Sequence, residues 1–177
     1  MRHLDLFSGI GGFAYAAQQV WGDQHEIHSF VEIEPYAQKV LKKHWPDVPI
    51  HEDVTTYEHD GTPIDLVSGG FPCQDLSSNG RQIGFAGERS TLYSEIIRIC
   101  RNARPKYIIM ENVPNLLSGG GGYWFGKLLN DLAKSGYNAE WESISAASIG
   151  FDQIRDRVFI LAYPASIRWS SVEFHNR

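Results

Sequence analysis

Cys73 is the residue of this chain best placed for nucleophilic chemistry. It lies in the segment Phe71-Pro72-Cys73-Gln74, in a glycine-rich stretch directly after a short apolar run. A thiolate is a strong nucleophile, and nearby cations or helix ends lower its pKa. Cys100 instead lies on an apolar helical face, so we expect it to be a buried structural residue. The cations that could serve Cys73 are Arg81, Arg89, Arg155 and Arg157.

Two further segments carry charged groups suited to acid–base chemistry or to recognition. Glu111 ends an apolar run in Glu111-Asn112-Val113-Pro114, where a carboxylate is either a general acid or base or a structural group. In Gln153-Ile154-Arg155-Asp156-Arg157 the two arginines alternate along an incipient strand and share one face. This geometry suits the binding of an anion or polar group, or else a salt-bridged strand start.

The N-terminal segment is typical of proteins that bind nucleotide-like ligands. Asp5-Leu6-Phe7-Ser8-Gly9-Ile10-Gly11-Gly12-Phe13 runs from a strand through a glycine turn into a helix, so backbone N–H groups can approach a ligand. Its glycines satisfy a loose dinucleotide-binding pattern, and Glu32 follows about 20 residues on, where a ribose-binding carboxylate belongs. Asp53 could accept a hydrogen bond from an adenine amino group. The pattern alone does not distinguish NAD from S-adenosylmethionine.

Alternating strands and helices must position these segments. Apolar runs predict strands over residues 3–7, 26–31, 64–68, 107–110 and 157–161, the last paired with residues 140–144. Helical periodicity predicts helices over residues 12–20, 36–44, 90–101 and 124–134. This alternation indicates an α/β fold with a mainly parallel sheet. Since ligands of such sheets bind at the carboxyl ends of the strands, we expect the candidate residues to meet at one rim.

Length and composition exclude several classes of protein. The 177 residues, 42% hydrophobic and 21% charged, fit one globular domain rather than a disordered chain. No apolar run is long enough to span a membrane, and the N-terminus lacks the pattern of a signal peptide, so we expect a soluble, cytoplasmic protein. The two cysteines and the scattered histidines lack metal-site spacing, and we expect no metal.

The charge of the chain is unevenly distributed. Residues 1–75 carry a net charge of −8 and the remainder +3, which gives −5 for the chain. A polyanion would therefore contact the second part, where four basic residues cluster. For that run alone we favour a solvated helix face. The four residues are Arg98, Arg101, Arg104 and Lys106.

Taken in order, these segments resemble the motifs of the C5-cytosine DNA methyltransferase family. Residues 7–12 are similar to its first, cofactor-binding motif, residues 71–74 to its Pro-Cys motif and residues 111–113 to its Glu-Asn-Val motif. Residues 153–157 are similar to its Gln-x-Arg-x-Arg motif, and residues 89–93 to the segment after its catalytic loop. The resemblance covers residues 3–163. It implies a Rossmann-like, S-adenosylmethionine-dependent methyltransferase fold with helices on both faces of the sheet.

The resemblance also implies a role for each matching residue. Cys73 would add to C6 of cytosine, and Glu111 would protonate or hydrogen-bond N3. Arg155 would hold the base oxygen, with Arg157 as the second candidate. The cofactor would be S-adenosyl-L-methionine, with Glu32 at the ribose and Asp53 near the adenine. The residues expected to bind it are Phe7, Gly9, Ile10, Gly12, Glu32, Ile33, Asp53, Val54, Pro72 and Leu92.

The implied substrate is double-stranded DNA with the target cytosine flipped out of the stack. Residues 77–87 would form the loop that closes over the flipped base. We divide the chain into a catalytic domain, residues 1–163, and a tail, residues 164–177, that could begin the family's variable region. The family's target-recognition region and last motifs have no counterpart in the sequence, so the resemblance implies a C-terminally truncated domain with an exposed apolar patch at the gap.

Several interpretations stay open at this stage. The chain is the catalytic half of a split methyltransferase completed by a second polypeptide, an inactive remnant that binds S-adenosylmethionine or DNA, or a compact enzyme that contacts DNA through another surface. The alternative enzyme class is an NAD-dependent oxidoreductase, which rests only on the glycine pattern and Glu32. Binding of S-adenosylhomocysteine but not of NAD would separate the two enzyme classes.

Overall fold

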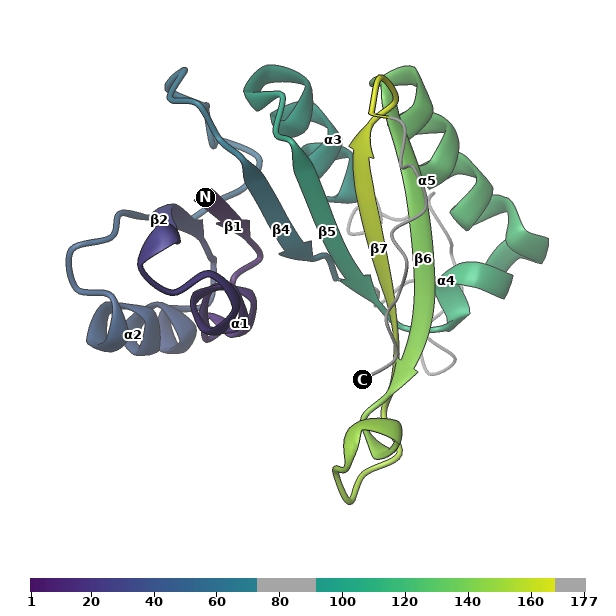
Figure 1. Cartoon of the computed structure of the whole chain (residues 1–177), viewed down its shortest axis with the longest axis horizontal. Helices are drawn as coiled ribbons and strands as arrows, with labels where there is room; N and C mark the ends of the chain where they lie inside the picture. The colour runs from purple at the N-terminus through teal and green to yellow at the C-terminus, as the bar shows by residue number, and fades with distance from the viewer. Residues whose placement is uncertain (73–91, 168–177) are drawn as a thin grey trace.

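The computed structural model describes residues 1–72 and 92–167, which form one seven-stranded sheet with helices packed against it (Figure 1). The strands lie in the order β3-β2-β1-β4-β5-β7-β6. The strands are β1 (Arg2–Leu6), β2 (Glu26–Val31), β3 (Ile50–His51), β4 (Leu66–Gly70), β5 (Tyr107–Asn112), β6 (Tyr137–Ser145) and β7 (Asp156–Pro164). The helices are α1 (Gly12–Trp21), α2 (Pro35–His44), α3 (Leu92–Ala103), α4 (Asn115–Ser118) and α5 (Tyr123–Lys134), with short 3-10 turns at Gly22–Gln24, Gly119–Gly122 and Ala147–Ile149.

The first five strands of the sheet are parallel, and β7 and β6 complete it in antiparallel pairing. The predicted mainly parallel α/β sheet is therefore confirmed, as is the predicted pairing of the last two strands. The structure also contains β3 and α4, which sequence patterns did not reveal. With two and four residues respectively, both elements are too short to show a hydrophobic period.

Helices cover both faces of the sheet, as the resemblance implied. Phe30 and Val31 are successive residues of β2 and so point to opposite faces. Phe30 packs in a small cluster with Ala14 of α1 and Leu41 of α2. Val31 belongs to the main core, to which α3 and α5 contribute. Cys100 is buried in this main core, and burial raises the pKa of its thiol, so its predicted structural role is confirmed.

A buried polar network lies on the α1 side of the sheet. The Ser68 hydroxyl donates to Asp5 Oδ1 and lies 2.7 Å from His3 Nε2, and all three residues are fully enclosed. Burial raises the pKa of Asp5 to about 8 and lowers that of His3 to about 3. Asp5 is therefore held as a neutral acid at neutral pH, directly beneath the turn that leads to α1.

Candidate active site

The residues predicted to bind the cofactor follow the carboxyl ends of β1, β2, β3 and β4, and Glu111 lies near the carboxyl end of β5. From β1 the chain proceeds through α1 to β2 on one side, and β4 pairs with β1 on the other. The strand order reverses at this point, which is where open α/β sheets bind their ligands.

A cavity of about 100 Å³ opens at this rim. Seven of the ten residues predicted to bind the cofactor line it, together with Val31 and Glu52. The sequence does not point to Glu52 as a cofactor-binding residue. It directly follows β3, and this two-residue strand is too short to be recognised from the sequence. The seven predicted residues are Phe7, Glu32, Ile33, Asp53, Val54, Pro72 and Leu92.

The other three predicted residues, Gly9, Ile10 and Gly12, lie on the turn between β1 and α1. A Cβ atom built on Gly9 or Gly12 would meet nothing within 4 Å, so the backbone there is open to a ligand. Ile10 points into solvent, with an exposed fraction of 62%. The neighbouring Gly11 has a structural role, because it packs against the ring of Trp45.

Glu32 ties the turn to the end of β2. One carboxylate oxygen, Oε2, accepts a hydrogen bond from the Gly9 N–H at 2.6 Å, and Oε1 accepts one from the Glu34 N–H at 2.8 Å. Each oxygen keeps a second lone pair for a ligand hydroxyl. The carboxylate is therefore oriented before any ligand arrives, with 8% of the residue exposed at the cavity.

Asp53 is oriented by its own turn. Its Oδ1 accepts hydrogen bonds from the N–H and the hydroxyl of Thr55, both at 2.8 Å. These two bonds hold the pKa of Asp53 below its usual range. Within the described ranges its other oxygen, Oδ2, accepts no hydrogen bond, so an ionised acceptor is available beside the cavity.

The next part of the rim lies where β4 and β5 end side by side. Gly70 pairs with Glu111, and a Cβ atom on Gly70 would lie 3.0 Å from Glu111 Oε2. The buried Asn112 amide donates to the Phe71 carbonyl at 3.1 Å, which fixes the chain directly before Pro72. The Asn112 contact was not foreseen, although the residue belongs to the Glu-Asn-Val motif. Cys73 itself lies outside the described residues.

The two arginines of residues 153–157 behave differently. Arg157 Nε forms an ion pair with Glu111 Oε1 at 2.6 Å, with both side chains about three-quarters buried. Arg155 lies one residue before β7, and its exposed side chain contacts no partner among the residues that the structure describes. The structure thus brings Arg157, and not Arg155, to the carboxylate of Glu111.

The four basic residues of the second part of the chain contact other residues of the protein. Arg98 binds the loop between β3 and β4, and Arg101 and Arg104 donate to Ser135. Lys106 pairs with Asp65 at 2.7 Å. These contacts favour the structural explanation of the cluster over a site for a polyanion.

The described residues hold neither a membrane-spanning helix nor a cluster of metal ligands. No helix within residues 1–72 and 92–167 is long and apolar enough to cross a membrane. In the same ranges, no three His, Cys, Asp or Glu side chains group as a metal ion would require.

The fold defines a class, because solved structures of methyltransferases share it. A putative DNA modification methyltransferase encoded within an E. coli prophage matches 94% of this chain and 47% of its own, with a TM-score of 0.76 and 26% identity. The S. pombe Dnmt2 methyltransferase has the same fold, with a TM-score of 0.75 over 97% of this chain and 53% of its own, at 24% identity. The chain thus has the fold of S-adenosylmethionine-dependent methyltransferases.

Sequence comparisons identify the family. The family model of the C-5 cytosine-specific DNA methylase matches residues 1–177, and the chain belongs to that enzyme family. Type II methyltransferase M1.ScrFI of Lactococcus lactis subsp. cremoris is 36% identical over 92% of this chain and 41% of its own length. Type II methyltransferase M.HhaI of Haemophilus parahaemolyticus is 31% identical over 98% of this chain and 52% of its own. The chain spans about half the length of these curated relatives.

Proposed function

We propose that this chain is the catalytic part of a DNA (cytosine-5)-methyltransferase that transfers a methyl group from S-adenosylmethionine to C5 of a flipped cytosine. The observation that carries the proposal is the cavity at the rim. Its walls are the residues that the family resemblance assigns to the cofactor. Glu111 and the segment leading to Cys73 lie at the ends of the adjacent strands β5 and β4.

The residues at the cavity fit S-adenosylmethionine. Glu32 offers two oriented carboxylate oxygens to the ribose hydroxyls, and Asp53 offers an ionised oxygen to the adenine amino group. The apolar side chains of Ile33, Val54 and Leu92 line the cavity between them, where a flat base would bury its faces. When bound, the cofactor supplies an electrophilic methyl group.

Cys73 is the proposed nucleophile, a role that rests on its place in the Pro-Cys motif. Cytosine C5 is a weak nucleophile in the free base. Addition of the Cys73 thiolate to C6 moves electron density to C5, which can then attack an electrophile. After the transfer, a base removes the C5 proton, the bond between sulfur and C6 breaks, and the thiolate leaves.

Glu111 is the proposed partner of N3, where addition at C6 places negative charge. Arg157 holds Glu111 Oε1, while Oε2 faces the end of β4, from which the chain continues to Cys73. A proton or hydrogen bond from Glu111 to N3 would stabilise the ring during the addition. Arg155, whose side chain is exposed, stays the proposed ligand of the base oxygen.

Double-stranded DNA is the proposed substrate, because a stacked cytosine cannot meet Cys73 and must be flipped into the pocket. The segment proposed to close over the base, residues 77–87, lies outside the described residues. We propose that the protein is cytoplasmic, where it would meet this DNA.

We propose that residues outside 1–177 supply target recognition, because the curated relatives are about twice as long. A second polypeptide is one proposed source of these residues. The sheet has a surface suited to further contacts. Half-buried Ile109, Phe159 and Leu161 share one face of β5 and β7, at a hollow of about 340 Å³ that strand residues alone line. An apolar surface of this kind is typical of an interface.

The direct test mixes the purified 177-residue chain with radiolabelled S-adenosylmethionine and unmethylated DNA of mixed sequence. Label that enters DNA as 5-methylcytosine, and is lost in Cys73→Ser, would support the catalytic assignment and refute the need for further protein. Absence of label, with S-adenosylhomocysteine still bound, would support that need. An NAD-dependent oxidoreductase would bind NAD instead, so a chain that binds NAD and not S-adenosylhomocysteine overturns the proposal.

A further inference from the structure

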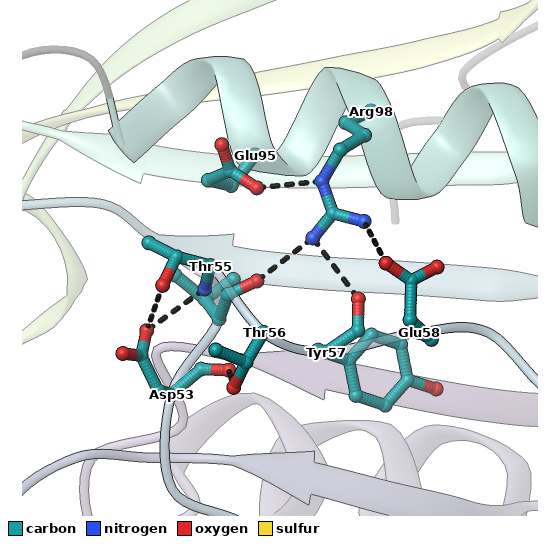
Figure 2. Close-up of polar contacts among 8 residues, drawn as sticks. Asp53, Thr55, Thr56, Tyr57, Glu58, Glu95 and Arg98 are labelled. Carbon is teal, nitrogen blue, oxygen red and sulfur yellow. Dashed lines mark hydrogen bonds and ion pairs between the residues drawn. The ribbon is translucent and has the colours of Figure 1, made fainter.

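Arg98 on α3 joins this helix to the loop that forms one wall of the cavity (Figure 2). Its Nη2 donates to two backbone carbonyls of the loop, Val54 at 2.9 Å and Tyr57 at 3.0 Å. Its Nε binds Glu95 Oε2 at 2.6 Å, and its Nη1 lies 3.6 Å from Glu58 Oε1. The guanidinium therefore holds both ends of the Val54–Tyr57 turn at once.

Asp53 lies directly before this turn. Asp53 is hydrogen-bonded to Thr55, and its carbonyl accepts the Thr56 N–H at 3.2 Å (Figure 2). Asp53, Val54 and Leu92 all line the cavity, and Leu92 is the first residue of the helix that carries Arg98. Arg98 thus ties together the two segments that contribute these lining residues.

We propose that Arg98 is a positioning residue for adenine recognition, holding the turn so that Asp53 accepts a hydrogen bond from the exocyclic amino group. This inference rests on the proposed function. Arg98 does not line the cavity and acts through the two carbonyls that it binds. Without it, the Val54 and Tyr57 carbonyls lose their shared donor, and Asp53 loses its fixed position relative to α3.

The arginine side chain is suited to this role because its planar group offers five donors in a fixed geometry. A lysine at this position could bind one carbonyl and keep the charge, but it could not hold Glu95 and both carbonyls together. Arg101 provides a matched control on the same helix. Its Nε donates to Ser135 Oγ at 3.0 Å, and it makes no contact with the Val54–Tyr57 turn.

The test compares S-adenosylhomocysteine with its hypoxanthine analogue, in which a 6-oxo group replaces the amino group. Dissociation constants are measured by calorimetry for the wild-type chain and the Arg98→Ala, Arg98→Lys, Asp53→Ala and Arg101→Ala variants. We expect the wild-type chain to prefer the adenine ligand by roughly ten- to hundredfold, the effect of a hydrogen bond to a charged group. Arg98→Ala and Asp53→Ala should lose most of this preference, Arg98→Lys should be intermediate, and Arg101→Ala should keep it.

The preference ratio separates positioning from simple stabilisation, since a loss of stability alone leaves the ratio unchanged. The inference is overturned if Arg98→Ala keeps the wild-type ratio, or if the wild-type chain binds both ligands equally. If Arg98→Ala does not fold, the Arg98→Lys ratio decides in the same way. A wild-type chain that binds neither ligand overturns the proposed function itself, which distinguishes the two failures.

Discussion

Replacing Gly11 with alanine should destabilise the turn between β1 and α1, whereas the adjacent Gly12 should accept alanine freely. Gly11 has a φ of 89° and a ψ of 31°, in the left-handed region, where a side chain costs about 1–2 kcal/mol. Its new Cβ atom would also lie 2.5 Å from the Trp45 ring, and such overpacking costs about 1–3 kcal/mol. The expected loss in the free energy of unfolding is about 2–5 kcal/mol.

Gly12 is the matched control for this prediction. It is the first residue of α1, and a Cβ atom there would meet nothing within 4 Å. Alanine should therefore leave the free energy of unfolding unchanged or raise it by up to about 1 kcal/mol, as expected for a helical position. Because Gly12 is proposed to meet the cofactor, Gly12→Ala should instead weaken the binding of S-adenosylhomocysteine.

Urea unfolding of both variants measures the difference, and a Trp45→Leu background isolates its cause. With the Trp45 ring removed, Gly11→Ala should cost only the backbone strain, so the double-mutant cycle should give a coupling of about 1–3 kcal/mol. An equal cost in both backgrounds would refute the contact with Trp45. A Gly12→Ala variant as unstable as Gly11→Ala would refute the different roles of the two glycines.

Three other substitutions test the site and its support. Cys73→Ser should abolish methyl transfer and leave binding of S-adenosylhomocysteine nearly unchanged; turnover retained in a radiolabel assay would exclude the covalent mechanism. Glu32→Ala should weaken that binding by about 1–3 kcal/mol, and an unchanged dissociation constant in calorimetry would remove Glu32 from the site. Folding raises the pKa of Asp5 from 3.8 to about 8, so as pH rises the Asp5 carboxyl ionises in the unfolded chain before it does in the folded chain. The free energy of unfolding therefore falls as pH rises from about 4 to 8. Asp5→Asn should therefore gain about 1.4 kcal/mol per pH unit relative to the wild type between pH 5 and 7 in urea unfolding, and a constant difference would show that Asp5 is ionised in the folded chain.

The sequence by itself determined the architecture and the membership of the rim. Alternating apolar runs and helical periods predicted the parallel sheet, because burial imposes those periods on any chain that forms it. The glycine turn, Glu32 and Glu111 each lie at the end of a predicted strand, and parallel strands bring their carboxyl ends to one edge. The position of Asp53 depends on β3, which the sequence did not reveal. The family resemblance implies ten cofactor-binding residues, and seven of these line one cavity.

Only the tertiary structure decided which side chains act on one another across the chain. Arg98 is 44 residues from the Val54 carbonyl that it binds, and Arg157 is 46 residues from Glu111. From sequence alone, Arg98 is one member of a basic cluster, and nothing indicates that Arg157 pairs with Glu111. Local periodicity does not encode such pairs, because they depend on the strand order β4-β5-β7 and on the helix packed behind it. The turn at Asp53 is a local feature, but its position relative to α3 is set by the contacts of Arg98.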